Sequence, residues 1–161
     1  MDAAPGLLGA LEHSGLGLAV RQSVWVYPAA NVGHVAFVTA FFAAVVVLDL
    51  ILLGVIPGGA ALAVRAKRAA MAIFVLVAST GAVLFIAEAS HVASNPVFLT
   101  KLAVIGLALL NAAVLGRRAM EALGAGQAET AAAIEKARWA AGVSLVLWML
   151  AVMLGRFIAY I

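Results

Sequence analysis

The sequence contains no cysteine. Disulfides, thiol catalysis, iron–sulfur clusters and thiolate zinc sites are therefore excluded. Charge is also scarce, because only 11% of the 161 residues are Asp, Glu, Lys or Arg, against about a quarter in a soluble domain. A chain of this length with so few charges cannot cover its apolar surface with polar side chains, which excludes an ordinary water-soluble fold.

Hydrophobic residues, in contrast, make up 66% of the chain. They gather in continuous runs at about residues 30–53, 69–90, 96–116 and 139–158. Each run has the length, about 20 residues, of a helix that crosses a hydrocarbon core of about 30 Å. The runs do not alternate in polarity, so a membrane β-barrel is rejected. The sequence predicts an all-α fold, an integral membrane four-helix bundle.

Residues 1–28 are expected to form an N-terminal segment that precedes a membrane domain at residues 29–161. The segment is moderately apolar, but it carries Glu12 and Arg21 and is too polar to span a membrane. It ends near Trp25, a side chain that favours the headgroup level. We expect a short interfacial helix on the periplasmic side.

Local residues predict where the membrane helices begin and end. Gly54 and Pro57 follow the first run and stop it. Asn95 followed by Pro96 predicts a helix start, with the asparagine as cap and proline at the first helical position. The basic residues at 65–68 are expected in a loop, and residues 119–135 are expected in a surface helix-turn.

The positions of the basic residues predict the orientation in the membrane. Arg65, Lys67 and Arg68 follow the first run, and a second basic group lies between the third and fourth runs, whereas the turn at 91–96 has no Lys or Arg. Positive residues stay on the cytoplasmic side. We therefore expect a bacterial inner-membrane protein with both termini facing outward. The net charge of +3 is explained in this way, and nucleic-acid binding is not expected because no basic, aromatic-interleaved face exists.

Ionisable groups inside the apolar runs are the best indication of function, because a charge at mid-membrane costs about 2.5–3.5 kcal/mol. The predicted topology brings a polar group from every helix to the outer leaflet. This predicted outer cluster consists of His34, Glu88, Lys101, Arg156 and Tyr160. Glu88 is expected to pair with Lys101 or Arg156, because an unpaired charge at this depth is more costly. The alternative is that these charges only pin the helices or extend to the headgroups.

Two further polar residues lie deeper in the runs. Asp49, near the cytoplasmic end of the first run, is expected to form an ion pair with Arg65 or Arg68. Asn111 is expected to make an interhelical hydrogen bond, which usually stabilises a membrane bundle by about 0.6 kcal/mol.

These residues belong to a wider pattern. The chain resembles a bacterial family of small four-helix inner-membrane proteins known only as a domain of unknown function. The matching pieces are Tyr27-Pro28 with His34; Asp49-Leu50-Ile51-Leu52-Leu53-Gly54; Thr80-Gly81 with Leu84-Phe85; Asn95-Pro96 with Phe98 and Lys101; Leu110-Asn111-Ala112; and Gly155-Arg156 with Ile158-Ala159-Tyr160.

The resemblance covers most of residues 22–161 and implies the same four-helix topology. It singles out His34, Lys101 and Arg156 but not His91, and it implies no established activity. The family tends to have an arginine where this chain has Ile51, which weakens an Asp–Arg role. By architecture alone, the chain is also similar to four-helix b-type cytochromes and copper-resistance membrane proteins.

Three functions remain open from the sequence. The first is an accessory or anchoring subunit that docks a membrane or periplasmic partner, or self-associates. The second is a haem-b electron-transfer module in which His34 and His91 are the metal ligands and Arg156 pairs with the propionates. The third is a small transporter, or a quinone or metal site. No soluble-type catalytic motif is present, so we expect no enzyme activity from the chain alone, although it could be the membrane subunit of an oxidoreductase.

Overall fold

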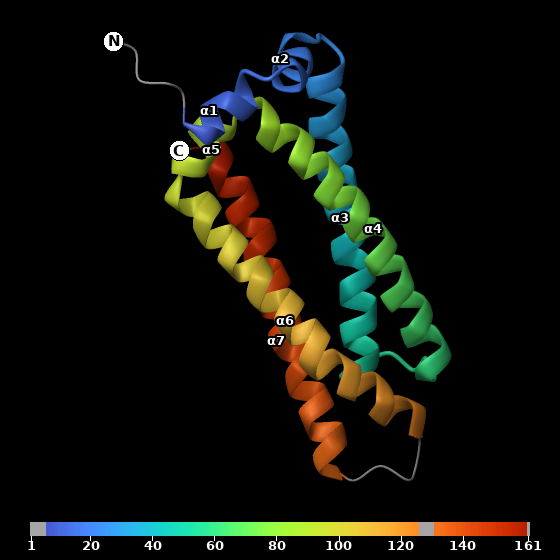
Figure 1. Ribbon diagram of the computed structural model, residues 1–161. Coiled ribbons are helices and arrows are strands. Elements are labelled where there is room, and N and C mark those ends of the chain that lie inside the picture. Colours follow the sequence, from blue (N-terminus) through green and yellow to red (C-terminus); the bar gives the residue numbers. More distant parts are fainter. Residues whose placement is uncertain (1–5, 126–130, 161) are drawn as a thin grey trace.

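The computed structural model describes residues 6–125 and 131–160, and within these ranges the chain forms helices and loops without strands. The long helices are α3 (Val26–Leu52), α4 (Gly59–Ala87), α6 (Pro96–Ala125) and α7 (Ala131–Phe157) (Figure 1). The short elements are α1 (Leu7–Glu12), α2 (Gly15–Gln22), α5 (Ala89–Ser94) and the 3-10 helix η2 (Ile158–Tyr160).

The four long helices are long and apolar enough to cross a membrane. The apolar stretches are Val26–Leu52, Gly59–Ala87, Pro96–Val114 and Ile134–Phe157. Their exposed sides carry large hydrophobic residues such as Val75, Leu107 and Val146, as expected for surfaces that contact lipid. The prediction of an all-α chain with four apolar helices that could span a membrane is therefore confirmed for the described residues.

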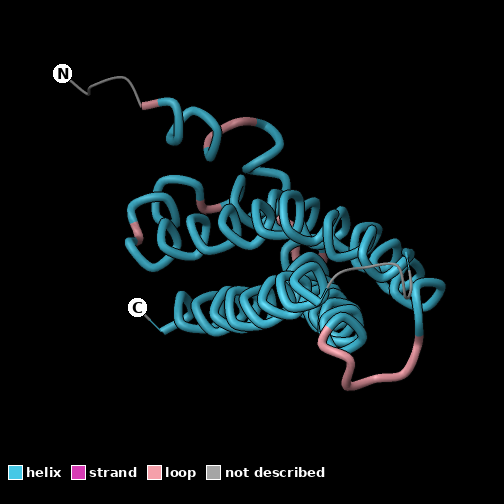
Figure 2. Tube along the Cα trace, turned by 90° about the horizontal axis from the view of Figure 1, so that it is seen from below, coloured by secondary structure: helices cyan, strands magenta, loops and turns pink. Residues whose placement is uncertain are grey.

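The long helices pair into two hairpins that are each continuous in sequence. Helix α3 packs along α4, and α6 packs along α7, while the hairpins meet mainly where α3 contacts α7 (Figures 1 and 2). Helices α1, α2 and α5 gather at one end of the bundle, with the last residues of the chain near them (Figure 1). We call this the α5 end, and we call the opposite end, where α3 turns into α4, the turn end.

An aromatic cluster joins the two hairpins in the core. The ring of Phe41 in α3 lies edge-on to Trp148 in α7, with ring centroids 4.6 Å apart, and contacts Phe74 of α4 at 5.4 Å. Val104 and Ala108 of α6 complete the contact. Edge-to-face aromatic pairs contribute about 0.5–1.5 kcal/mol beyond their area, so this cluster ties all four long helices together.

Alanines let the helices of each hairpin approach closely, as small residues do in membrane bundles. The buried ones in α4, α6 and α7 are Ala63, Ala66, Ala70, Ala87, Ala108, Ala137, Ala140, Ala141 and Ala151. In α3, Ala44 packs against the core, whereas Ala36 and Ala40 are exposed. Large residues, Phe41 and Val45, are buried on this helix.

The predicted punctuation residues do end and begin helices. Gly54 follows α3 with φ 78°, a left-handed conformation that favours glycine, and the Val55 amide then donates to the Leu50 carbonyl at 2.9 Å. At the start of α6, the Val97 amide donates to Oδ1 of Asn95 at 2.9 Å, and Pro96 is the first helical residue. Both predictions are confirmed.

Other predicted boundaries differ from the structure. The basic residues 65–68 lie inside α4, not in a loop. The turn at Pro57 and Gly58 ends before them, and the alanine-rich stretch that follows this turn favours helix. The N-terminal segment forms two short helices, since the Ser14 hydroxyl accepts from the Gly17 amide and starts α2. Residues 126–130 of the predicted helix-turn lie outside the described residues.

Candidate membrane-embedded polar site

His34 in α3 is held by the neighbouring helix of its own hairpin. Its Nδ1 lies 2.9 Å from Oγ1 of Thr80 in α4. The Thr80 hydroxyl donates its own hydrogen to the Leu76 carbonyl at 2.8 Å, so its oxygen accepts from Nδ1–H of His34. In a neutral imidazole the second nitrogen, Nε2, then carries a lone pair. Nε2 makes no side-chain hydrogen bond among the described residues.

The His34 ring also requires a glycine opposite it. A Cβ added to Gly81 would lie 3.1 Å from Cε1 of His34, which is closer than ordinary van der Waals contact. The pair Thr80-Gly81 therefore supplies both the hydrogen-bond partner and the space for the imidazole. Together these contacts fix the ring between α3 and α4, in the half of the bundle near the α5 end.

Lys101 reaches the same region from the other hairpin. Its Nζ atom lies against Gly155 of α7, 3.4 Å from the position that a Cβ would take there, and its charge acts on the His34 ring. Among residues 6–125 and 131–160, no carboxylate lies within ion-pair distance of this ammonium group. The candidate site therefore combines a cation and a histidine from different hairpins, with the Lys101 charge close enough to act on the His34 ring.

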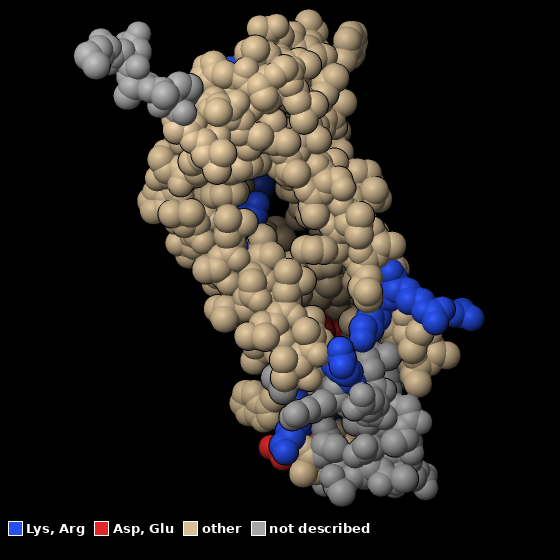
Figure 3. Space-filling view, in the orientation of Figure 1, with Lys and Arg blue, Asp and Glu red and all other residues tan. Residues whose placement is uncertain are grey.

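The hairpins leave this region open on one side. Figure 3 shows a hollow between α4 and α6, nearer the α5 end, and Lys or Arg atoms are visible inside it. Helices α4 and α6 contact each other less than α3 and α7 do. Because α4 and α6 are both apolar enough to span, this hollow opens toward the space that lipid would occupy.

Glu88 does not join this site. It follows α4 at the break before α5, and its Oε1 accepts a hydrogen bond from the Tyr27 hydroxyl at 3.1 Å. The expected pairing with Lys101 or Arg156 is not formed, because the end of α4 directs this carboxylate toward the start of α3. Tyr27 is thus a polar partner that the sequence reasoning missed.

The remaining members of the predicted outer cluster are exposed. Arg156 and Tyr160 lie on the surface at the C-terminal end of α7 and in η2, and His91 is exposed on α5. The Lys101 charge acts on His34, whereas Glu88 bonds Tyr27 and Arg156 and Tyr160 are exposed at the same end of the molecule.

The predicted pair of haem ligands is also separated. His34 is bonded at the level of Thr80, which lies about 10 Å along α4 below Ala87, whereas His91 lies beyond that helix on α5. Within the described ranges, no group of three or more His, Cys, Asp or Glu side chains could hold a metal ion.

The N-terminal segment is tied to the bundle by a network that the sequence did not indicate. Glu12 pairs with Arg21 at 2.8 Å, and its Oε2 accepts from the Ser90 amide of α5 at 3.1 Å. The hydrogen bonds from Ser90, together with Arg21, lower the pKa of the Glu12 carboxyl below its ordinary value. The segment therefore lies across the α5 end. The sequence could not indicate this contact, because Glu12 and Ser90 are 78 residues apart and no local pattern connects them.

Asp49 lies deep in the other half of the bundle. It is 3% exposed and hydrogen-bonds Ser144 of α7. The expected ion pair with Arg65 or Arg68 is not formed, because Asp49 faces α7 whereas those two arginines are exposed on α4. The Asn111 prediction is confirmed, since its Nδ2 donates to the Ala140 carbonyl at 3.0 Å and links α6 to α7.

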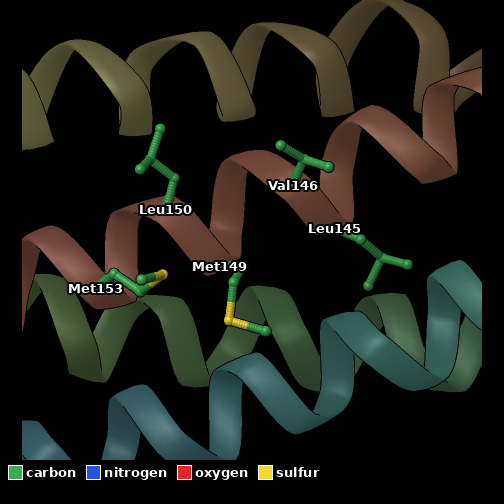
Figure 4. A pocket seen from close by; sticks show the side chains of 5 residues that line it. All are labelled: Leu145, Val146, Met149, Leu150 and Met153. Atoms are coloured by element: carbon green, nitrogen blue, oxygen red, sulfur yellow. The ribbon is translucent and has the colours of Figure 1, made fainter.

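A hollow of about 420 Å³ lies on α7 itself and is lined by Leu145, Val146, Met149, Leu150 and Met153 (Figure 4). All five lining side chains are apolar, and Val146 and Met153 are more than half exposed. Neither His34 nor Lys101 lines it, so this hollow has the character of a lipid-facing surface.

Comparison of the chain with protein-family models, with curated proteins and with solved structures finds no match. The roles expected from the sequence, an accessory subunit or a haem module, stay predictions.

Proposed function

We propose that this chain is a bacterial inner-membrane protein that binds an anionic amphiphile between its two hairpins. Lys101 supplies the positive charge and His34 the second polar contact. The observation that carries the proposal is the Lys101 ammonium group, which lies against Gly155 of α7 without an acidic partner among the described side chains.

The physical reason is the cost of an unpaired charge. A charged group in hydrocarbon is stable only with a counter-charge or with hydrogen bonds. A phosphate or carboxylate that enters through the hollow would supply both to Lys101, while its acyl chain would remain in lipid. Nε2 of His34 would accept a hydrogen bond from a hydroxyl of the same head group.

The orientation that we propose has both termini outside. The basic residues of α4 lie toward the turn end, and positive residues favour the cytoplasmic side. The candidate site then lies in the outer half of the membrane, and its ligand comes from the outer leaflet.

Native mass spectrometry of the protein released from nanodiscs tests the binding. Nanodiscs would contain equal amounts of phosphatidylglycerol, which has a phosphate and hydroxyls, and phosphatidylcholine. We expect phosphatidylglycerol to be retained preferentially by the wild type and by Lys101→Arg, but not by Lys101→Met.

Lys136→Met is the matched control, because Lys136 is an exposed lysine of α7. It should retain phosphatidylglycerol like the wild type. Equal retention of both lipids by the wild type, or equal retention by Lys101→Met, would overturn the proposal. Replacing phosphatidylglycerol with oleate distinguishes a lipid head group from a free carboxylate as the preferred anion.

The second candidate function is haem binding through His34, which the hydrogen bond between its Nδ1 and Thr80 favours. A histidine whose Nδ1 is fixed by a hydrogen bond presents Nε2 to a metal in the usual manner. Purified protein should then show a Soret band that is absent from His34→Ala. A wild-type spectrum without this band, after expression with added haem precursor, removes the candidate.

A further inference from the structure

A buried carboxyl group lies where the two hairpins meet, far along α3 from the Lys101 site. Asp49 is 3% exposed, and its neighbour Ser144 on α7 is 8% exposed. One carboxyl oxygen, Oδ2, is buried and has no hydrogen-bond partner among the described residues. The Asp49 carboxyl group therefore has one hydrogen bond, to Ser144, and one oxygen without a partner among the described residues.

The charged groups around Asp49 do not neutralise it. On α7, the guanidinium group of Arg138 lies against Gly54, with Nη2 3.2 Å from the Cβ position there, beyond the end of α3. On α4, Ala63 and Ala66 are buried and the cations of residues 65–68 lie outside ion-pair distance. On α6, the side-chain amide of Asn111 donates its hydrogen bond to the Ala140 carbonyl and not to Asp49.

A carboxylate in such a place would be an unpaired charge in a water-poor environment, and burial of an unpaired charge is strongly unfavourable. The neutral carboxylic acid avoids this cost, and the vacant Oδ2 is the atom that can carry the hydrogen. We propose that Asp49 is a proton-binding site within the membrane, located at the joint between the two hairpins. This proposal does not depend on the ligand of Lys101.

The site also has a short route to water. Asp49 precedes Gly54 by five residues, about 7 Å along the helix. Gly54 lies in the turn between α3 and α4. Loss of the proton converts the carboxylic acid into a carboxylate and releases H⁺ at the turn end. Because α3 and α7 form the main contact between hairpins, the charge state of Asp49 acts directly on that contact.

Dicyclohexylcarbodiimide tests the proposal, because this apolar reagent dissolves in membranes and reacts with protonated carboxyl groups. The acid proton moves to a reagent nitrogen and the carboxylate oxygen bonds to the central carbon. The O-acylisourea then rearranges to an N-acylurea, so no atom is lost. We expect one reagent molecule on Asp49 in full-length protein in nanodiscs, located by peptide mass spectrometry, with labelling that falls as the pH rises.

Two controls keep the outcome clear. Asp49→Asn removes the carboxyl and should abolish the modification, while Glu135, an exposed carboxyl on α7, should remain unlabelled in every sample. Asp49→Glu preserves a carboxyl and should restore labelling if the asparagine variant folds poorly. Absence of label on Asp49 in folded wild-type protein from acid to neutral pH, or labelling that does not change with pH, would overturn the proposal.

Discussion

The imidazole of His34 and the hydroxyl of Thr80, 2.9 Å apart, form a side-chain hydrogen bond between α3 and α4. Because Thr80 has already donated its hydrogen to Leu76, the bond has a defined direction, from His34 to Thr80. Nε2 makes no side-chain hydrogen bond among the described residues. The contact can therefore be tested by a change at Thr80 alone.

Thr80→Val removes the acceptor while it keeps the shape of the side chain. The Nδ1–H group of His34 then loses its partner, and we expect the free energy of unfolding to fall by about 1 kcal/mol. Unfolding by sodium dodecyl sulfate in bicelles measures this change. Thr80→Ser keeps the hydroxyl and should remain within about 0.5 kcal/mol of the wild type; equal losses in both variants would contradict the assigned bond.

Trp148→Ala removes the central ring of the aromatic cluster. The ring contacts Phe41 and Phe74, so we expect a loss of about 3–5 kcal/mol, as for other buried large-to-small changes. The same bicelle titration measures it. Trp139 on the same helix is 70% exposed, and Trp139→Ala should change stability by about 0.5 kcal/mol or less. A small effect of Trp148→Ala would show that the hairpins are joined elsewhere.

Acidification should release the N-terminal segment from α5. Contacts with Ser90 and Arg21 lower the pKa of Glu12 below 4.5. A lowered pKa in the folded state means that the stabilisation is present above pH 4.5 and is lost as the pH falls through the folded-state value. Hydrogen exchange of residues 7–22 should therefore quicken as the pH falls below 4.5, after correction for intrinsic rates.

Glu12→Gln should show fast exchange in the same segment at neutral pH, because it lacks the charge that pairs with Arg21. In this variant acidification should add little. If the wild-type segment exchanges equally fast at both pH values, Glu12 does not hold it.

Asn111→Leu should have a small effect on stability. The change removes the hydrogen bond to the Ala140 carbonyl, but it also removes a buried Oδ1 that has no hydrogen-bond partner among the described residues. Since such bonds average about 0.6 kcal/mol in membrane bundles, we expect a change of that size or smaller in the bicelle titration. Asn111→Asp keeps the oxygen, loses the donor and adds a charge, so it should destabilise considerably more.

The positions of the membrane helices could be predicted because they depend on local properties of the chain. Apolar runs located the spans, and Gly54 and the Asn95–Pro96 pair ended and began helices through their own backbone preferences. The start of α4 was placed too late because basic residues were assigned to a loop, although Lys and Arg are good helix formers.

The direction of each polar side chain could not be predicted in the same way. A helix that is apolar all round has no polar stripe to show its buried face, so Asp49 was assigned to Arg65 and Arg68 and not to Ser144. His34 and Lys101 were identified because polar groups in apolar runs are rare. Their partners, Thr80 and Gly155, are ordinary residues in a membrane helix, and nothing in the sequence linked them to His34 and Lys101.

The pairing of helices that are neighbours along the chain has a consequence for biosynthesis. Helices α3 and α4 make most of their contacts with each other, as do α6 and α7, so the first pair can assemble while the ribosome is still producing the second. Two spanning helices in each pair would return the chain to its starting side of the bilayer. A chain divided at α5 would therefore give two halves that each insert without a conflict of topology, and the aromatic cluster is the contact that would reunite them.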